Sequence, residues 1–345
     1  MKPLIIEETQ RYEIPFVYAA TYIREGDCEV GVFASEGREG KCVLLRDGNT
    51  RLERVWESPG GTMTVCTSDN QGGFYAVQQF FPVFDSRKAC VVSAKKENGK
   101  WSVKKILDVP YVHRFDVVDT RQGRFLLISQ LTRNKKERTD WSQPGSVYAV
   151  ALDEKEQPVG APVVLIDRLF KNHGYFRGVL NGSQVAMVSG TEGLYGIYID
   201  PEKNPAYWEI RQLVDHEVSD VAIYDMDQDG RDELVTIEGF HGDNLFVYKE
   251  TDGSWKQVYR YSIHFGHALW AGDIFGSPAI LIGYRREDCA LKLLRKEPNC
   301  WCFEETVLST ELGPTNVDVR KKEQSYEVLC AGRTMDVGVI YRITE

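Results

Sequence analysis

Residues 219–258, SDVAIYDMDQDGRDELVTIEGFHGDNLFVYKETDGSWKQV, decide the fold. Four short runs rich in β-branched and aromatic residues alternate here with turns built from Gly, Asn and Asp, which is the pattern of successive short strands. No segment of the chain keeps an apolar period of 3.6 residues over a dozen positions, so helices are not expected. The sequence therefore predicts an all-β protein.

The same order of strand, turn, strand, loop, strand, turn and strand recurs along the chain. It is repeated in residues 266–307 and again in 315–344, where the unit ends after its third strand. Four earlier units can be drawn at 16–56, 61–107, 113–167 and 173–213. Seven four-stranded units of about 50 residues have the size of β-propeller blades.

The last unit lacks a fourth strand, and residues 3–10 form a spare strand at the start of the chain. That strand can complete the last blade, which would close the ring and remove its exposed edges. We therefore predict one seven-bladed propeller domain over residues 1–345. A two-domain β-sandwich is the alternative, but it explains neither the fixed unit nor the spare strand.

Composition limits the partners. The net charge of −9 and the isoelectric point near 5.4 argue against nucleic acid and against anionic membranes. No apolar run approaches the length of a membrane span, and the first residues do not resemble a secretory signal. The eight cysteines lie mostly inside apolar runs, as reduced thiols of a cytoplasmic protein do. A small-molecule ligand is expected, and a homo-oligomer is compatible with the sequence.

An acidic turn interrupts the quoted stretch. Asp225, Asp227 and Asp229 alternate along it, Gly230 follows, and Glu233 lies beyond. Carboxylate oxygens on a short loop suit Ca²⁺ or Mg²⁺. The corresponding turns of the next two units have lost these carboxylates, so we expect a structural cation, or an acidic turn without an ion, rather than catalysis.

Histidines mark the opposite end of the strands. Four stand at or just before the first strand of consecutive units: His113, His173, His216 and His267. His241 lies in a loop between second and third strands, which returns to the same end. A single histidine at such a position usually bonds a backbone carbonyl, but four equivalent ones around a propeller axis indicate a shared pocket. Neutral imidazoles bind Zn²⁺, Mn²⁺ or Fe²⁺, and three of them with an open position describe a catalytic site.

The same register brings further polar side chains to this face. The candidates for substrate binding are Gln79, Arg177, Glu238, Arg285 and Arg333, and Arg114 and Tyr175 follow the histidines directly. Such a mixture suits a hydroxyl-rich or anionic small molecule better than an apolar one.

Four segments carry a family resemblance: VPYVHRFDVV (109–118), DHEVSDVAIYDMDQDGRDELVTIEGFHG (215–242), HFGHALWAGD (264–273) and VLCAGRTMDVGVIY (328–341). They resemble the FG-GAP/VCBS-type seven-bladed propeller that forms the N-terminal domain of aldos-2-ulose dehydratases. The resemblance implies dehydration of keto-sugars by a carbon–oxygen lyase with a metal ion in the propeller. The histidine motifs of that family correspond in this sequence to His113, His173, His216 and His267.

β-Elimination beside a carbonyl needs a Lewis acid, a base for the α-proton and an acid for the leaving oxygen. We predict that His173, His216 and His267 hold a divalent transition metal. His113 or His241 then serves as the base and Tyr175 as the acid, while Arg114, Arg285 and Arg333 orient the substrate. The competing hypothesis is a propeller without catalytic activity that binds a sugar or a protein.

Overall fold

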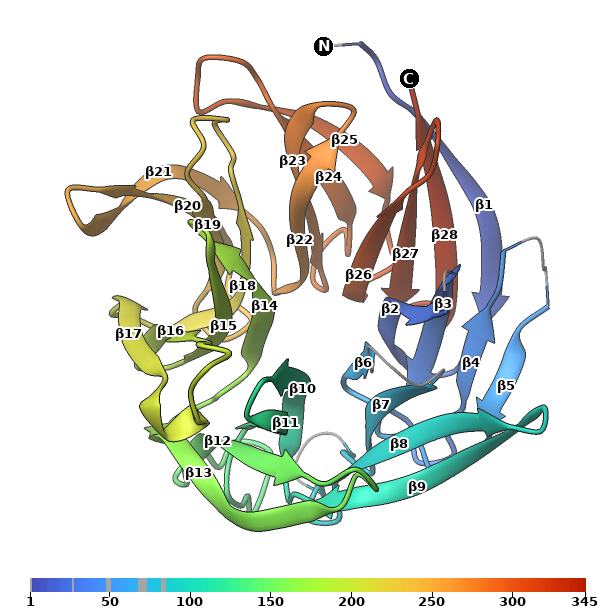
Figure 1. Cartoon of the computed structure of the whole chain (residues 1–345). Coiled ribbons are helices and arrows are strands. Elements are labelled where there is room, and N and C mark those ends of the chain that lie inside the picture. Colours follow the sequence, from blue (N-terminus) through green and yellow to red (C-terminus); the bar gives the residue numbers. More distant parts are fainter. Residues whose placement is uncertain (1, 27, 48–50, 68–72, 82–84) are drawn as a thin grey trace.

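The computed structural model describes residues 2–26, 28–47, 51–67, 73–81 and 85–345. In these residues, seven four-stranded antiparallel sheets stand in a ring around a central axis (Figure 1). The prediction of an all-β, seven-bladed propeller is confirmed. Among the residues that the structure describes, no helix has the length and apolar character that a membrane crossing requires.

Each blade runs from an innermost to an outermost strand. The first contains β2 (Val17–Glu25), β3 (Cys28–Ser35), β4 (Cys42–Leu45) and β5 (Glu53–Trp56). The second contains β6 (Val65–Thr67), β7 (Gly73–Gln78), β8 (Cys90–Glu97) and β9 (Lys100–Asp108). The third contains β10 (Val112–Thr120), β11 (Gly123–Gln130), β12 (Gly145–Leu152) and β13 (Pro158–Leu169). The fourth contains β14 (Gly174–Leu180), β15 (Ser183–Gly190), β16 (Gly193–Tyr198) and β17 (Glu209–Val214), with the 3-10 helix η1 (Pro205–Tyr207) before β17.

The fifth blade contains β18 (Val218–Tyr224), β19 (Glu233–Glu238), β20 (Asn244–Thr251) and β21 (Ser254–Ser262). The sixth contains β22 (Gly266–Ile274), β23 (Ser277–Tyr284), β24 (Leu291–Lys296) and β25 (Phe303–Ser309). The seventh contains β26 (Pro314–Lys321), β27 (Tyr326–Gly332) and β28 (Val337–Thr344), and its outermost strand is β1 (Ile5–Glu13) from the start of the chain.

The ring is closed by both ends of the chain. Strand β1 pairs antiparallel with β28 from Ile5 opposite Thr344 to Glu13 opposite Val337, and the two termini lie near each other in Figure 1. The innermost strand β26 of this blade packs against β2 of the first. The spare N-terminal strand therefore completes the last blade, as the repeat predicts.

Irregularities in the inner strands aim side chains at the axis. The register of five inner strands shifts across one residue, namely Tyr18, His113, Ser219, His267 and Thr315. Such a bulge bends the strand and re-aims the residue at the bulge. Thr64 and His173 directly precede the inner strands β6 and β14, so they occupy the corresponding position in the other two blades.

Four of these seven side chains bond the main chain of the next blade at the same level. Thr64 Oγ1 donates to the carbonyl of His113 at 2.9 Å, and Thr315 Oγ1 donates to that of Tyr18 at 2.9 Å. Nδ1 of His173 lies 3.0 Å from the Ser219 carbonyl, and Nδ1 of His267 lies 2.9 Å from the Thr315 carbonyl. The histidines are therefore part of a polar belt that ties neighbouring blades together near the propeller axis.

Gly174, beside this belt, has no room for a side chain. A Cβ atom there would lie 2.2 Å from Ser189 Oγ and 2.7 Å from the Ser219 carbonyl. The glycine thus lets the fourth and fifth blades approach closely, directly next to His173. Apolar side chains fill the spaces between the blades, as in the cluster that joins Leu281 of the sixth blade to Val339 of the seventh.

Candidate metal centre in the axial channel

Three histidines from three loops and strands meet at the axis. His173, His241 and His267 each offer one ring nitrogen, and these atoms all lie within 4.8 Å of one another. The Nε2 atoms of His173 and His241 are 3.1 Å apart. His173 and His267 are 2% and 3% exposed, and His241 is partly buried. The group has the residue types and the spacing of a metal-binding triad.

The backbone fixes the tautomer of two of these imidazoles. A carbonyl only accepts hydrogen bonds, so the Nδ1 atoms of His173 and His267 must carry the protons that they share with Ser219 and Thr315. Their Nε2 atoms keep the lone pair that a metal requires, an arrangement common among metal-binding histidines. A tetrahedral site with bonds of about 2.0 to 2.1 Å separates its nitrogens by roughly 3.3 Å, close to the observed 3.1 Å.

His241 reaches the group from the loop between β19 and β20. Its backbone adopts a left-handed conformation with φ of 50°, which histidine tolerates better than most residues. The backbone N–H of His241 donates to Ser219 Oγ at 3.1 Å, which ties this loop to the bulge of the same blade. Ser219 thus supports two of the three imidazoles.

His113 and Tyr18 extend the group around the axis. The ring centroids of His113 and His173 are 4.5 Å apart. The Tyr18 hydroxyl lies 3.3 Å from His113 Nε2 and 3.4 Å from His267 Nε2. Nδ1 of His113 is buried and has no hydrogen-bond partner within the described part of the chain. A buried polar atom without a partner is rare in proteins, so Nδ1 of His113 is a candidate for contact with a water molecule, an ion or a ligand.

Aromatic rings keep water away from the imidazoles. Phe80 packs 5.2 Å from His113, Phe240 packs 5.4 Å from His173, and Phe265 packs 4.7 Å from His241, measured between ring centroids. Desolvation penalises the charged form of an imidazole. The dry walls therefore favour neutral histidines.

The pKa values follow from this burial. Burial lowers the pKa of His173 to about 3, with the Arg114 charge as a second cause. Burial also lowers the pKa values of His113, His241 and His267 well below the usual range, and neighbouring imidazoles and arginines add to the effect. Burial raises the pKa of Tyr18. Near pH 7 the cluster therefore consists of neutral imidazoles and a protonated phenol, which are suited to metal binding and to proton transfer.

His216 does not join this group, and the expected ligand set is corrected accordingly. Its side chain is 49% exposed, and its Nε2 lies 2.8 Å from Glu238 Oε2 and 3.4 Å from the Tyr248 hydroxyl. The axial position of the fifth blade belongs to Ser219, three residues later, where the bulge lies. His241 supplies the third nitrogen in place of His216.

The other predicted side chains have other partners. Tyr175 donates to Asp116 Oδ2 at 3.0 Å, and Arg177 Nε pairs with the same oxygen at 2.8 Å. Arg333 Nε pairs with Glu36 at 2.6 Å. Gln79 Nε2 lies 4.0 Å from Cys90 Sγ. Glu238 bonds His216, as described above. None of these contacts is to the three-histidine group, so a substrate role for these residues stays a prediction.

The sequence interpretation missed Tyr18, although a signal was present. Phe16-Val17-Tyr18 and Tyr111-Val112-His113 share the order aromatic, valine, ring-bearing residue. The aromatic residue has a left-handed φ in both, 57° at Phe16 and 58° at Tyr111. Aligning the starts of the inner strands on this short pattern would have placed Tyr18 at the position in its blade that His113 occupies in the third blade.

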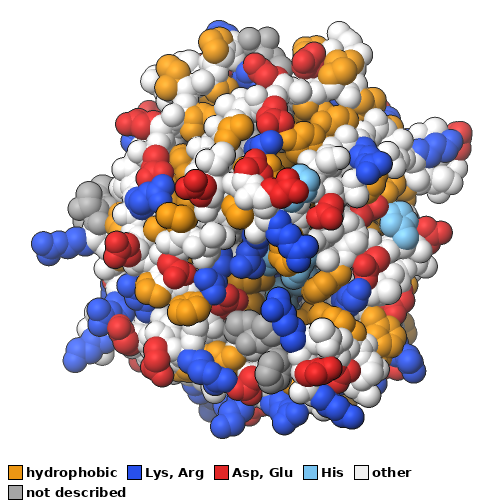
Figure 2. All heavy atoms as spheres, turned by 180° about the vertical axis from the view of Figure 1, so that it is seen from behind, with side chains coloured by type: hydrophobic (Ala, Val, Ile, Leu, Met, Phe, Trp, Pro, Cys, Tyr) orange, Lys and Arg blue, Asp and Glu red, His pale blue; other side chains and the backbone are white. Residues whose placement is uncertain are grey.

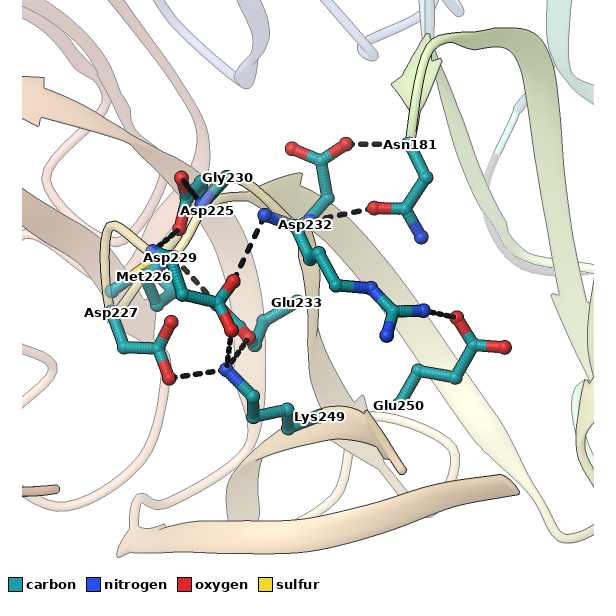
Figure 3. A network of polar contacts seen from close by, with 11 residues as sticks. Asn181, Asp225, Met226, Asp227, Asp229, Gly230, Asp232, Glu233, Lys249 and Glu250 are labelled. Carbon is teal, nitrogen blue, oxygen red and sulfur yellow. Dashed lines mark hydrogen bonds and ion pairs between the residues drawn. The ribbon is translucent and has the colours of Figure 1, made fainter. Parts of the chain in front are cut away.

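The acidic turn holds a lysine among its carboxylates (Figure 3). Lys249 Nζ lies 2.5 Å from Asp227 Oδ2, 2.6 Å from Asp229 Oδ2 and 3.4 Å from Glu233 Oε1. Asp225 instead accepts the backbone N–H groups of Asp229 and Gly230 at 3.1 and 2.9 Å. The oxygens of the three aspartates lie within 4.8 Å of one another, yet an internal ammonium already supplies the positive charge. A structural cation at this turn would have to share the carboxylates with Lys249, and both the cation and the acidic turn without an ion stay predictions.

Comparisons with known proteins add no assignment. No protein-family model matches the chain, and no curated protein matches it either. The fold class is that of a seven-bladed β-propeller, and propellers host many unrelated functions. Function must therefore be argued from the axial site itself.

Proposed function

We propose that the protein is a metal-dependent carbon–oxygen lyase that acts on a keto-sugar in the axial channel. The observation that supports it best is that ring nitrogens of His173, His241 and His267 lie within 4.8 Å of one another, with the tautomers of His173 and His267 set by backbone carbonyls. Three neutral imidazoles leave at least one coordination position open, which is the arrangement of catalytic rather than structural sites. The resemblance to the propeller of aldos-2-ulose dehydratases suggests the substrate class.

The residues around the triad supply the proton transfers. A divalent cation held there would polarise the carbonyl oxygen of the substrate. His113, neutral and with an unpartnered Nδ1, takes the α-proton at that atom. The electron pair of the broken C–H bond forms the C=C bond as the C–O bond at the β-carbon breaks. Tyr18 gives its proton to the leaving oxygen, and the Nε2–H of His113, 3.3 Å away, restores the phenol.

Elimination can be followed through the absorbance of the conjugated enone that it produces. The purified protein, a chelator-treated sample and the His267→Ala variant should be incubated with a panel of 3-keto and anhydro-keto sugars. His264→Ala is the matched control, because its ring is partly exposed and contacts Glu287 at 3.1 Å instead of the triad. We expect turnover by the wild type and the control only. A folded, metal-loaded wild type that releases no enone from any of these sugars would refute the lyase and favour the non-catalytic binding module.

A further inference from the structure

Two arginines near the axial histidines make no ion pair within the described residues. Arg114 follows His113 on β10 and is 8% exposed. One of its terminal nitrogens donates to the Met63 carbonyl at 3.2 Å, and its buried Nε has no hydrogen-bond partner among the described residues. Arg285 lies in the loop that follows β23 and is partly buried. In the described part of the chain its guanidinium makes no hydrogen bond and no ion pair, and burial lowers its pKa.

Both charges act on the candidate metal centre. The Arg285 guanidinium lowers the pKa values of His267 and His241, and that of Arg114 lowers the pKa values of all four axial histidines. The geometry agrees: Arg114 directly follows His113 on β10, and the backbone N–H of Arg285 donates to the carbonyl of Phe265, whose ring packs 4.7 Å from that of His241. Figure 2 shows blue Lys and Arg side chains gathered around the centre of the face on which histidines are visible.

An unpaired charge away from water is costly. Removing an ion from water destabilises the folded state unless a partner compensates. Acidic residues outnumber basic ones in this protein, since its net charge is −9, and other arginines do have acidic partners, such as Arg320 with Glu327. Burial raises the pKa of Asp220 to about 6 and the Arg114 charge lowers it, so Asp220 is largely ionised near pH 7, but no ion pair joins the two residues in the described part of the chain. Glu36 is the acid that acts on Arg285, and it pairs with Arg333 instead. Neither Arg114 nor Arg285 thus makes an ion pair within the described residues.

We propose that the substrate carries a carboxylate group that Arg114 and Arg285 bind beside the histidine triad, so that it is a sugar acid rather than a neutral keto-sugar. This inference rests on the proposed use of the channel as the substrate site. Guanidinium groups present paired N–H donors that match the two oxygens of a carboxylate. The Nε–H of Arg114 and the guanidinium of Arg285, which have no partner among the described residues, are donors of this kind, and the bound carboxylate would compensate both charges.

The experiment measures binding of D-glucuronate and D-glucose to the chelator-treated full chain by calorimetry. Because no metal and no turnover are involved, its outcome is independent of the elimination reaction. We expect glucuronate to bind at least tenfold more tightly than glucose. Replacing Arg285 by Met should weaken glucuronate binding roughly ten- to hundredfold, the usual effect of losing a charged hydrogen bond, and leave glucose binding unchanged. Arg285→Lys should recover part of the loss.

The matched control is Arg286→Met, which removes the same charge from the neighbouring position. Arg286 is exposed and stacks its guanidinium 4.7 Å from the Phe265 ring, so glucuronate affinity should stay within twofold of the wild type. Glucose binding as tight as glucuronate, no detectable glucuronate binding, or an Arg285→Met variant with unchanged affinity would each overturn the proposal. Inorganic phosphate that displaces glucuronate at equal or lower concentration would overturn it too, in favour of a phosphorylated ligand. Selective glucuronate binding without enone formation from any substrate would refute the lyase and retain the carboxylate site.

Discussion

Acid should unfold the metal-free protein through its buried histidines. Burial lowers the pKa of His173 from 6.5 to about 3 in the folded state. Between these two values the unfolded chain binds a proton that the folded protein does not, so the free energy of unfolding falls as the pH falls. The slope is about 1.4 kcal/mol per pH unit for one histidine, which gives about 2 kcal/mol for His173 between pH 6.5 and pH 5. The pKa values of His113, His241 and His267 shift in the same direction and add to the loss.

Urea unfolding at several pH values between 7.5 and 5, in the presence of a chelator, measures this slope. His173→Gln removes one titrating group, so it should lose about 2 kcal/mol less than the wild type over the same range. Carboxylates that titrate in this range affect both proteins equally and cancel in the comparison. Equal slopes for wild type and His173→Gln would refute the neutral, buried cluster.

Three further predictions concern the acidic turn and the blade contact. Lys249→Met leaves the carboxylates of the turn without their cation, so the melting temperature should fall in chelator and recover with Ca²⁺; a drop that Ca²⁺ does not reverse would contradict this account. Burial raises the pKa of Glu233 to about 7 from 4.5, so its ionisation lowers the stability of the folded protein as the pH rises through this range. The wild type should therefore lose up to about 3 kcal/mol of unfolding free energy between pH 4.5 and pH 8 that Glu233→Gln does not lose. A difference between the two proteins that stays the same at every pH in urea unfolding would contradict this. Gly174→Ala pushes a methyl group against Ser189 and the Ser219 carbonyl, which should cost about 1 to 3 kcal/mol of stability and weaken Zn²⁺ binding; unchanged Zn²⁺ affinity would show that this contact does not position His173.

The architecture could be predicted because the order of strands and turns repeats regularly along the sequence. Units that repeat strands and turns specify blades, and the spare strand at Ile5–Glu13 had only one free edge to pair with, that of β28. The histidines could be assigned to one end of the propeller for the same reason, since strand direction alternates within a blade. These inferences need only strand order and no atomic detail.

The membership of the triad depends on details that strand order does not contain. A one-residue bulge decides that Ser219, rather than His216, faces the axis in the fifth blade. His241 reaches the site only because its loop turns through a left-handed backbone conformation. The role of Lys249 was missed for a related reason, because its approach to the acidic turn depends on the pairing of β19 with β20, which brings it beside residues more than fifteen positions earlier.

Metal content after equilibration with Zn²⁺ and removal of excess ion tests the central claim most directly. The account predicts one tightly bound ion per folded chain, lost in His241→Ala and His267→Ala and retained in His216→Ala. Retention in His241→Ala together with loss in His216→Ala, or a folded wild type that binds no ion at all, would contradict it.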